Sequence, residues 1–391
     1  MDRSILHNIR VLDFSWVLAG PYATRLLADF GAEVIKVQPL MAEEEDRFTR
    51  AYYNAWNRNK LGITLNLNKP EGLEIIRKLI RISDVVVENF SPRVMANWGL
   101  DYFESEKIKP EIIYLSLSLM GQSGPWKDYS GFGPTVQALS GITHLTAYPG
   151  QPPSGIGYSY ADHVAGLYAS LAIMGALEYR LKTGHGQYID LSQTEAMSSL
   201  LSDAIIDYTL KGRDVKPTGN ASLQSAPHGV YRCLGEDRWC AIAVTIEDEW
   251  QGFKRAIGRP AWADEERFST LKGRLENIEA LDKLVQGWTE KHSAEEVMAA
   301  LQKEGVPAGR VQNAADLAHD PHLKDREFFI DIEDPTLGKI STDASPIRLS
   351  QNPAGYRWAA PARGQDNDYV YGQLLGLKMA DLKRLREGNV I

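Results

Sequence analysis

The sequence predicts an α/β protein with a parallel β-sheet that carries helices on both faces. Between about residues 8 and 150, short β-branched apolar runs alternate with amphipathic segments, which is the pattern of strand–helix–strand units. The 391 residues are 43% hydrophobic and 24% charged, an ordinary composition for a globular enzyme. A chain of this length can bury a large core without disulfides or structural metals, and it allows roughly two or three domains.

The individual elements follow from apolar spacing. Strands are predicted where short apolar runs lie between turn residues: 9–13, 33–37, 84–87, 112–117 and 188–191. Helices are predicted where apolar residues recur at helical spacing: 22–30, 72–82, 161–181 and 195–210. The breaker Thr183-Gly184-His185-Gly186 ends the third of these helices. The fourth reads as one long helix.

The pattern changes between about residues 218 and 320. A hairpin is predicted from runs 230–233 and 239–244, and charged amphipathic helices follow at 277–292 and 294–304. This region predicts a smaller α+β domain. The tail from 325 shows further strand patterns and a last helix: 328–332, 340–342 and 377–387.

Several functional classes are excluded by composition. The net charge is −8 with no basic patch, which argues against nucleic acid as a partner. The longest apolar stretch, 164–177, is interrupted by two glycines and is too short to span a membrane. Cys233 and Cys240 have no metal-ligand spacing, so neither a metal site nor a disulfide is expected. With no signal peptide at the start, these features predict a cytoplasmic protein.

Asp162 is the strongest candidate for chemistry, and two interpretations stay open. It stands near the start of the 161–181 helix, where a carboxylate commonly stabilises the helix dipole. A carboxylate at such a helix start also stays ionised and can act as a covalent nucleophile. No GxGxxG, Walker or GxSxG pattern offers a rival site for a dinucleotide, a phosphate or a serine nucleophile.

The segment 160–192, which contains Asp162, resembles the signature of class III CoA-transferases, the group that includes formyl-CoA:oxalate, carnitine and bile-acid CoA-transferases. The resemblance covers nearly the whole chain, and the order and spacing of its motifs are more specific than any single one. The other matching segments are 11–14, 19–21, 27–37, 57–60, 84–90, 121–125, 137–141, 219–220, 226–227 and 305–307.

The resemblance implies a mechanism and an architecture. Asp162 aligns with the family's catalytic aspartate, which carries CoA through anhydride and aspartyl-CoA thioester intermediates. CoA thioester is then a substrate, and no tightly bound cofactor or metal is expected. The family's fold is a Rossmann-like large domain made from both termini, here 1–217 and 321–391, with a small domain inserted at 218–320. Two chains interlock, so a homodimer or a heteromer with a homologous subunit is expected.

The resemblance also suggests the residues around Asp162. Asn97 and Ser130 stand where some relatives have basic residues, so other cations are needed for the CoA phosphates. The candidates for CoA binding are Lys36, Arg58, Lys60, Asn89, Phe90, Arg93 and Lys127. The candidates for the substrate pocket and for oxyanion stabilisation are Ser15, Val17, Phe132, Gly133 and Gln224.

Three departures from the family pattern narrow the reaction. Phe132 replaces the histidine of the racemase branch and cannot exchange a proton, which leaves an acyl-CoA racemase as the weaker alternative. The oxalate-using branch carries a glutamine in the first strand–helix loop, where this chain has Val17, and a glycine run in place of 222–226. We therefore expect an acceptor larger and less polar than oxalate, such as a substituted succinate, with succinyl-CoA as donor. A non-catalytic CoA-binding subunit is the alternative from a different class.

Overall fold

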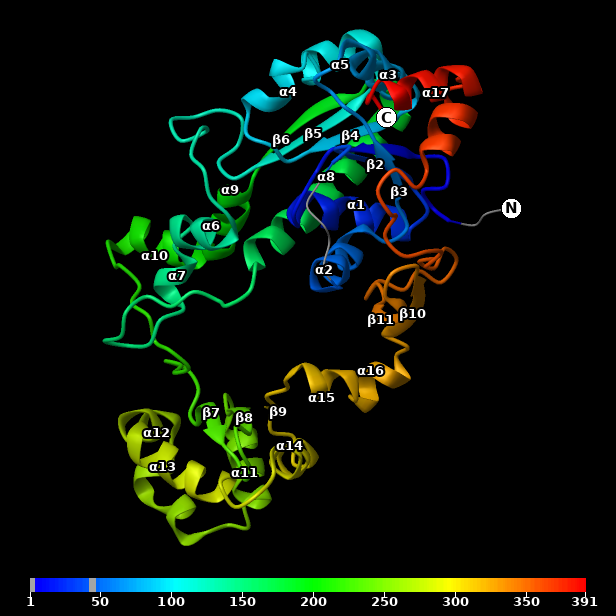
Figure 1. Cartoon of the computed structure of the whole chain (residues 1–391). Helices are drawn as coiled ribbons and strands as arrows, with labels where there is room; N and C mark the ends of the chain where they lie inside the picture. The colour runs from blue at the N-terminus through cyan, green and yellow to red at the C-terminus, as the bar shows by residue number, and fades with distance from the viewer. Residues whose placement is uncertain (1–3, 42–46) are drawn as a thin grey trace. The chain divides into compact units, whose positions relative to one another are not determined.

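The computed structural model describes residues 4–41 and 47–391 and divides into two compact units (Figure 1). The large unit consists of Met1–Thr143, Gly155–Val215 and Lys324–Ile391, and the small unit of His144–Ser154 and Lys216–Leu323. The chain therefore enters the small unit twice, whereas the sequence suggested one insertion. The domain limits at 217/218 and 320/321 that the family resemblance implied stay a prediction.

The large unit contains a six-stranded sheet in the order β3-β2-β1-β4-β5-β6, with every neighbouring pair parallel. The prediction of an α/β fold with a Rossmann-like sheet is confirmed. Because the strand order reverses between β1 and β4, ligands are expected beyond the carboxyl ends of these two strands. The strands are β1 (Arg10–Asp13), β2 (Glu33–Gln38), β3 (Leu61–Thr64), β4 (Val85–Glu88), β5 (Ile113–Ser118) and β6 (Gln187–Ser192).

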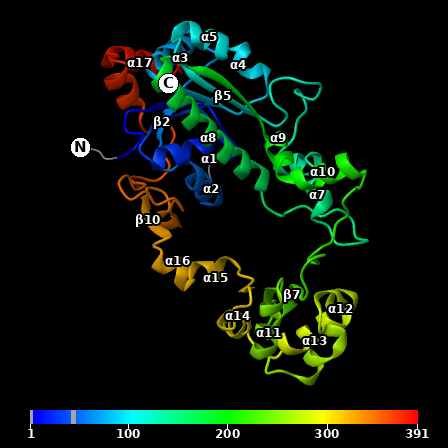
Figure 2. The ribbon, with the colours of Figure 1, turned by 180° about the vertical axis from the view of Figure 1, so that it is seen from behind.

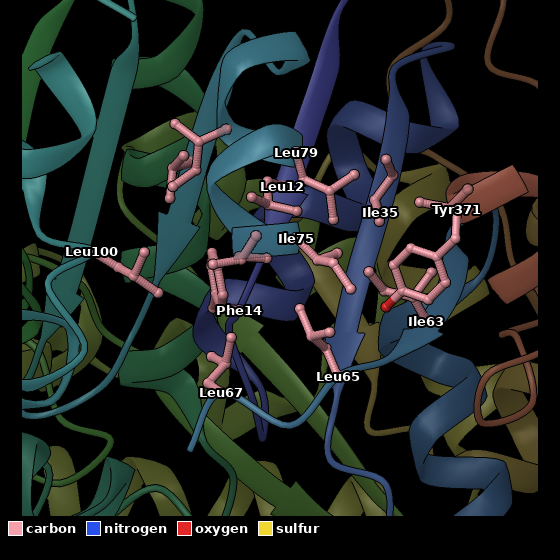
Figure 3. Close-up of a cluster of buried hydrophobic side chains, with 14 of the residues drawn as sticks. Leu12, Phe14, Ile35, Ile63, Leu65, Leu67, Ile75, Leu79, Leu100 and Tyr371 are labelled. Atoms are coloured by element: carbon pink, nitrogen blue, oxygen red, sulfur yellow. The ribbon is translucent and has the colours of Figure 1, made fainter. Parts of the chain in front are cut away.

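Helices cover both faces of this sheet (Figures 1 and 2). On one face, α3 (Pro70–Ile82) and α17 (Met379–Glu387) pack on alternate strand residues such as Leu12 and Ile35. Figure 3 shows Leu79 of α3 in this cluster. On the other face, α1 (Ala19–Asp29) and α8 (Tyr160–Thr183) pack on the intervening residues, Val11 and Val34 among them. This alternation along the strands is what two buried faces require.

The predicted helix 195–210 is wrong as a single helix. The structure divides it into α9 (Gln193–Ser198), a 3₁₀ turn (Ser199–Leu201) and α10 (Ser202–Lys211). The hydroxyl of Ser199 donates to the carbonyl of Ala196 at 2.8 Å, and that of Ser202 to the carbonyl of Ser199 at 2.7 Å. Serine hydroxyls that bond to nearby carbonyls compete with the helical pattern, which the apolar spacing does not reveal.

The small unit contains the predicted hairpin, β7 (His228–Arg232) with β8 (Trp239–Ala243), and β9 (Ala308–Arg310) extends it into a three-stranded antiparallel sheet. Its core includes both cysteines, which are free and buried. Burial raises the pKa of Cys233 to about 11, so this thiol is not a poised nucleophile. The helices of this unit are α11 (Glu247–Ala256), α12 (Leu271–Glu276), α13 (Ile278–Thr289), α14 (Ala294–Lys303) and α15 (Ala314–Ala318), with short 3₁₀ turns at Ala261–Asp264 and Glu266–Phe268. The helix α16 (Pro321–Asp325) contains the boundary between Leu323 and Lys324, where the chain returns to the large unit.

The remaining elements complete the chain. A second antiparallel pair, β10 (Phe329–Asp334) and β11 (Gly338–Asp343), lies in the large unit. The shorter helices are α2 (Arg47–Asn57), α4 (Arg93–Asn97), α5 (Tyr102–Ile108), α6 (Gly133–Leu139) and α7 (Ile142–Leu145), and a π-helix covers Asp368–Leu374. Among the described residues, no helix is both long and apolar enough to cross a membrane.

Candidate active site

The loop after β1 is fixed by the buried carboxylate of Asp13. This carboxylate accepts hydrogen bonds from the Ser15 backbone N–H at 2.8 Å, the Thr24 hydroxyl at 2.7 Å and the Lys60 ammonium at 3.0 Å. Lys36 lies 3.5 Å away and donates to the Ser15 carbonyl. Burial pushes the pKa of Asp13 upward, but the two lysines and the two hydroxyls hold it well below its usual range. The carboxylate is therefore ionised and anchors the start of the loop.

The same loop is tied across the sheet to the end of β4. The Asn89 side chain accepts a hydrogen bond from the Trp16 N–H at 2.8 Å and donates one to the Trp16 carbonyl at 2.9 Å. The next residue, Val17, has a φ of +62°, a conformation that β-branched residues adopt only under strain. The side chain of Asn89 thus holds a strained turn at the point where the strand order reverses.

A cavity of about 700 Å³ opens beside this turn, beyond the ends of β1, β2, β3 and β4. Its wall is mostly apolar and aromatic, with Trp16, Val17, Tyr52, Phe90 and Trp98 among the lining residues. The position of Phe90 is fixed by its N–H, which donates to the Glu88 carboxylate at 2.8 Å. The cavity lies where an open α/β sheet is expected to bind a ligand.

Asp162 lies in the first turn of α8 and faces the backbone of Gly133. A Cβ added at Gly133 would lie 2.5 Å from the Asp162 Oδ2, so the approach requires glycine. Burial raises the pKa of Asp162 to about 6, against a smaller lowering by its own backbone N–H. From the sequence we expected the helix start to favour the ionised carboxylate. Burial has the larger effect, and the pKa is raised instead. The carboxylate is nonetheless mostly ionised at pH 7, and it has lost part of its hydration, which makes it a better nucleophile.

Aromatic rings and His163 surround this helix start. The His163 Nδ1 lies 2.7 Å from the Ser159 carbonyl and its Nε2 lies 3.2 Å from the Tyr158 hydroxyl, with the two rings stacked at 4.8 Å. The rings of Tyr22 and Trp56 also pack against this imidazole, with centroid-to-centroid distances of 5.2 and 5.1 Å. Burial lowers the pKa of His163, so the ring is neutral and orients its neighbours.

Three predicted CoA-binding cations lie in the interior instead. Arg58 donates to the Asp29 carboxylate at 2.6 and 3.0 Å, and Lys36 and Lys60 belong to the Asp13 cluster. All three side chains are almost completely buried. Direct contact with CoA phosphates does not fit Arg58 and Lys60, because these ion pairs would have to break, and Lys36 reaches the cavity only as part of its wall.

The other predicted residues are more dispersed. Arg93 and Lys127 are exposed at the surface, and Arg93 lies 3.4 Å from the carboxylate of Asp128, next to Lys127. Phe132, which precedes Gly133, is 66% exposed. Gln224 lies in the small unit and is exposed. The structure brings together Ser15, Val17, Asn89 and Phe90 around the turn, and Gly133 with Asp162.

The sequence interpretation did not include Gln38 or Arg363, which also line the large cavity. Gln38 ends β2, and the rule that ligands lie at carboxyl ends of strands could have indicated it. Arg363 lies in an irregular segment of the C-terminal tail, and no sequence signal placed that segment beside the sheet.

Its relatives identify this protein as a CoA-transferase of class III. The sequence matches CoA-transferase family III over residues 6–367, and the chain belongs to this family. It is 36% identical to the succinyl-CoA–D-citramalate CoA-transferase of Chloroflexus aurantiacus, over 99% of this chain and 98% of that protein. It is 32% identical to the succinate–glutarate CoA-transferase of Agrobacterium fabrum, over 94% and 95% of the two chains.

A solved structure supports the same assignment. The crystal structure of a CAIB/BAIF family protein from Brucella suis superimposes with a TM-score of 0.86 at 31% identity, covering 95% of this chain and 99% of that one. The predicted family and enzyme class are therefore confirmed.

Proposed function

We propose that this enzyme transfers CoA from succinyl-CoA to a substituted succinate, through covalent intermediates on Asp162. The observation that carries the proposal is the half-buried Asp162 carboxylate, held against Gly133 at the start of α8 with its pKa raised to about 6. A partly desolvated carboxylate that is still ionised at neutral pH is what a covalent acyl-transfer nucleophile requires.

The proposed reaction needs no external proton or redox partner. An Asp162 oxygen attacks the thioester carbonyl, the C–S bond breaks, and a mixed anhydride and CoA thiolate form. The thiolate then attacks the aspartyl carbonyl, which releases free succinate and leaves an aspartyl-CoA thioester. The acceptor carboxylate attacks this thioester to form a second anhydride, and the thiolate attacks the acceptor's acyl carbonyl, which regenerates Asp162.

Neighbouring backbone groups support this chemistry. Tetrahedral intermediates place negative charge on the carbonyl oxygen, which N–H donors stabilise. Gly133 is in contact with Asp162, and the turn at Ser15 and Trp16 is held by hydrogen bonds from their N–H groups to Asp13 and Asn89, so we assign the oxyanion donors to the backbone N–H groups of Gly133 and Val17. We assign the CoA groove to the cavity lined by Phe90, with Arg93 and Lys127 as exposed cations for phosphate groups.

The substrate assignment has support from the sequence and from the relatives. Val17 makes the turn apolar, and aromatic side chains such as Tyr52 line the adjoining cavity. The relatives described above are named for citramalate, itself a substituted succinate, and for glutarate. These observations favour a dicarboxylic acid with an alkyl or aryl substituent over oxalate.

The covalent step can be tested by trapping. When the enzyme is incubated with succinyl-CoA and then treated with hydroxylamine, we expect an acyl hydroxamate on the peptide that contains Asp162, detected by mass spectrometry. A free carboxylate does not react, so enzyme without acyl-CoA is the control. No adduct with any of a wide panel of acyl-CoAs would refute covalent catalysis, and α-proton exchange with solvent deuterium without acyl transfer would indicate a racemase.

We also propose that two copies of the chain associate. The helix that carries Asp162 is apolar on several sides and exposes large apolar residues, including Leu167 at 50% and Leu171 at 70%, and α10 exposes Ile205 and Ile206. A helix apolar around its circumference normally lies buried, so a partner is expected to cover it. Light scattering of the purified chain should give twice the monomer mass. A stable monomer that transfers CoA only when a homologous subunit is added would refute self-association.

A further inference from the structure

Gln38 leaves a buried polar atom without a partner in the wall of the large cavity. The side chain is 8% exposed, and its Nε2 donates to the Tyr53 hydroxyl at 2.9 Å. Its Oε1 is buried and makes no hydrogen bond among the described residues. If the amide is turned over, the oxygen meets the hydroxyl and the nitrogen is left instead. In either orientation one amide atom lacks a partner, and such an atom is costly unless a ligand satisfies it.

Arg363 lines the same cavity and contributes a positive charge. One guanidinium nitrogen donates to the Pro39 carbonyl at 3.1 Å, and within the described part of the chain Arg363 makes no ion pair with a carboxylate. Its backbone segment is held on the sheet edge: the Gly62 N–H donates to Asp366 at 2.7 Å, and the Thr64 N–H donates to Asn367 at 3.0 Å. The guanidinium is therefore presented from a rigid segment.

Two neighbouring polar side chains of the wall are already engaged. The Lys36 ammonium is held by Asp13 and by the Ser15 carbonyl. Asn57 uses its side-chain oxygen to accept a bond from Lys60. Gln38 and Arg363 by contrast keep an amide atom and guanidinium N–H groups for a ligand, between aromatic walls that include Phe90 and Trp98.

We propose that Gln38 and Arg363 form the subsite that recognises the phosphorylated adenosine of the acyl-CoA, with Gln38 on the adenine edge and Arg363 on a phosphate. Adenine presents a donor and an acceptor side by side, so it can satisfy either orientation of the amide. Its ring stacks on aromatic side chains. A guanidinium binds phosphate through two parallel hydrogen bonds. The proposal rests on the proposed function, because it assigns one half of the same substrate.

The first test compares acyl donors that differ only in the nucleotide. Arg363→Ala should raise the KM for succinyl-CoA about tenfold with little change in kcat, and leave the KM for succinyl-pantetheine unchanged, because that donor lacks the nucleotide. Arg357→Ala is the matched control, since Arg357 is an exposed arginine of the same tail that stacks on Trp358 outside this cavity. An equal increase in KM for both donors would overturn the assignment.

Dephospho-succinyl-CoA then identifies the phosphate. If the effect of Arg363→Ala disappears with this donor, Arg363 binds the 3′-phosphate, and if it persists, Arg363 binds the diphosphate. Both results support the subsite. Calorimetric titration with free CoA should show the same tenfold loss of affinity, which separates binding from turnover.

The second test concerns the base. Gln38→Leu should raise the KM for succinyl-CoA about tenfold and leave the KM for succinyl-pantetheine unchanged, because that donor lacks the base. An unchanged KM for succinyl-CoA in a folded Gln38→Leu variant would refute the role of Gln38. If the trapped adduct on Asp162 forms normally while both variants bind CoA like the wild type, the subsite is wrong and the proposed function stands. If no adduct forms, the proposed function itself fails.

Discussion

Replacing Asp162 by asparagine should abolish CoA transfer and make the folded protein more stable at pH 8. The amide keeps the shape of the side chain but cannot attack a thioester, so no anhydride forms. Loss of a covalent nucleophile commonly reduces kcat by about 10⁴-fold or more. The measurement is the initial rate of succinyl-CoA consumption with acceptor present, together with CoA binding, which the variant should retain. A variant that keeps more than about 1% of the rate would contradict the nucleophile assignment.

The gain in stability follows from the raised pKa of Asp162. Burial raises it from 3.8 to about 6, so between these values the folded state binds more protons than the unfolded state. Stability of the wild type therefore falls as the pH rises through this window, and above it the cost is constant. Since one pKa unit corresponds to about 1.4 kcal/mol, the full cost is at most about 3 kcal/mol.

Asp162→Asn removes this cost, so its free energy of unfolding should exceed that of the wild type by about 1 to 3 kcal/mol at pH 8 and by less at pH 5. Denaturant titrations at the two pH values measure the difference. Asp203→Asn is the control. It makes the same chemical change in the first turn of α10, but at an exposed position. A pH-independent difference would show that the carboxylate is not held in a partly desolvated site.

The two residues Asp162 and Arg58 show what the sequence could and could not predict. Asp162 was found because a helix start is visible in the apolar spacing and because its flanking residues resemble a family signature. Arg58 also lies in a matching segment, but its guanidinium forms ion pairs with Asp29 and Asp343. These residues are 29 and 285 positions away in the sequence, so only the fold shows that they are neighbours. A basic residue in a motif therefore indicates a phosphate site only when the fold does not pair it with a carboxylate of the same chain.

The sheet was predicted more completely than the cavity beside it. Strands such as β4 are continuous apolar runs because both of their faces are buried, and such runs can be recognised directly in the sequence. The strand β3 has four residues after the polar segment 57–60 and was missed. The cavity is formed by the ends of four strands and by Arg363 from the distant tail, so its lining depends on contacts that no local pattern records.

Replacing Asp13 by asparagine should destabilise the protein severely. Asp13 is the single carboxylate of a buried cluster with Lys36 and Lys60, whose ammonium groups lie 3.5 and 3.0 Å from it. Asparagine leaves the two lysines in the interior without a counter-charge, so each must either stay charged at a high desolvation cost or give up its proton. Removing one partner of a buried ion pair typically costs about 3 to 5 kcal/mol, which denaturant titration at pH 7 should detect.

The matched variant is Lys60→Met, which leaves one aspartate and one lysine and so a neutral pair. Burial already lowers the pKa of Lys60 to about 7, although Asp13 opposes this change, which shows that the second positive charge is poorly accommodated. We therefore expect Lys60→Met to cost clearly less than Asp13→Asn. Equal losses for the two variants would contradict the view that Asp13 holds an excess of buried positive charge.

The free energy of unfolding of Asp13→Asn should also rise between pH 7 and pH 9. Without the carboxylate, both lysines have folded-state pKa values below their unfolded value of 10.5, so the unfolded state binds more protons in this window and stability rises with pH. Because the Asp13 carboxylate also fixes the Ser15 N–H at 2.8 Å, the folded fraction should in addition show a reduced kcat at saturating succinyl-CoA. A variant that loses stability but keeps the wild-type kcat would show that the cluster supports the fold alone and does not position the turn.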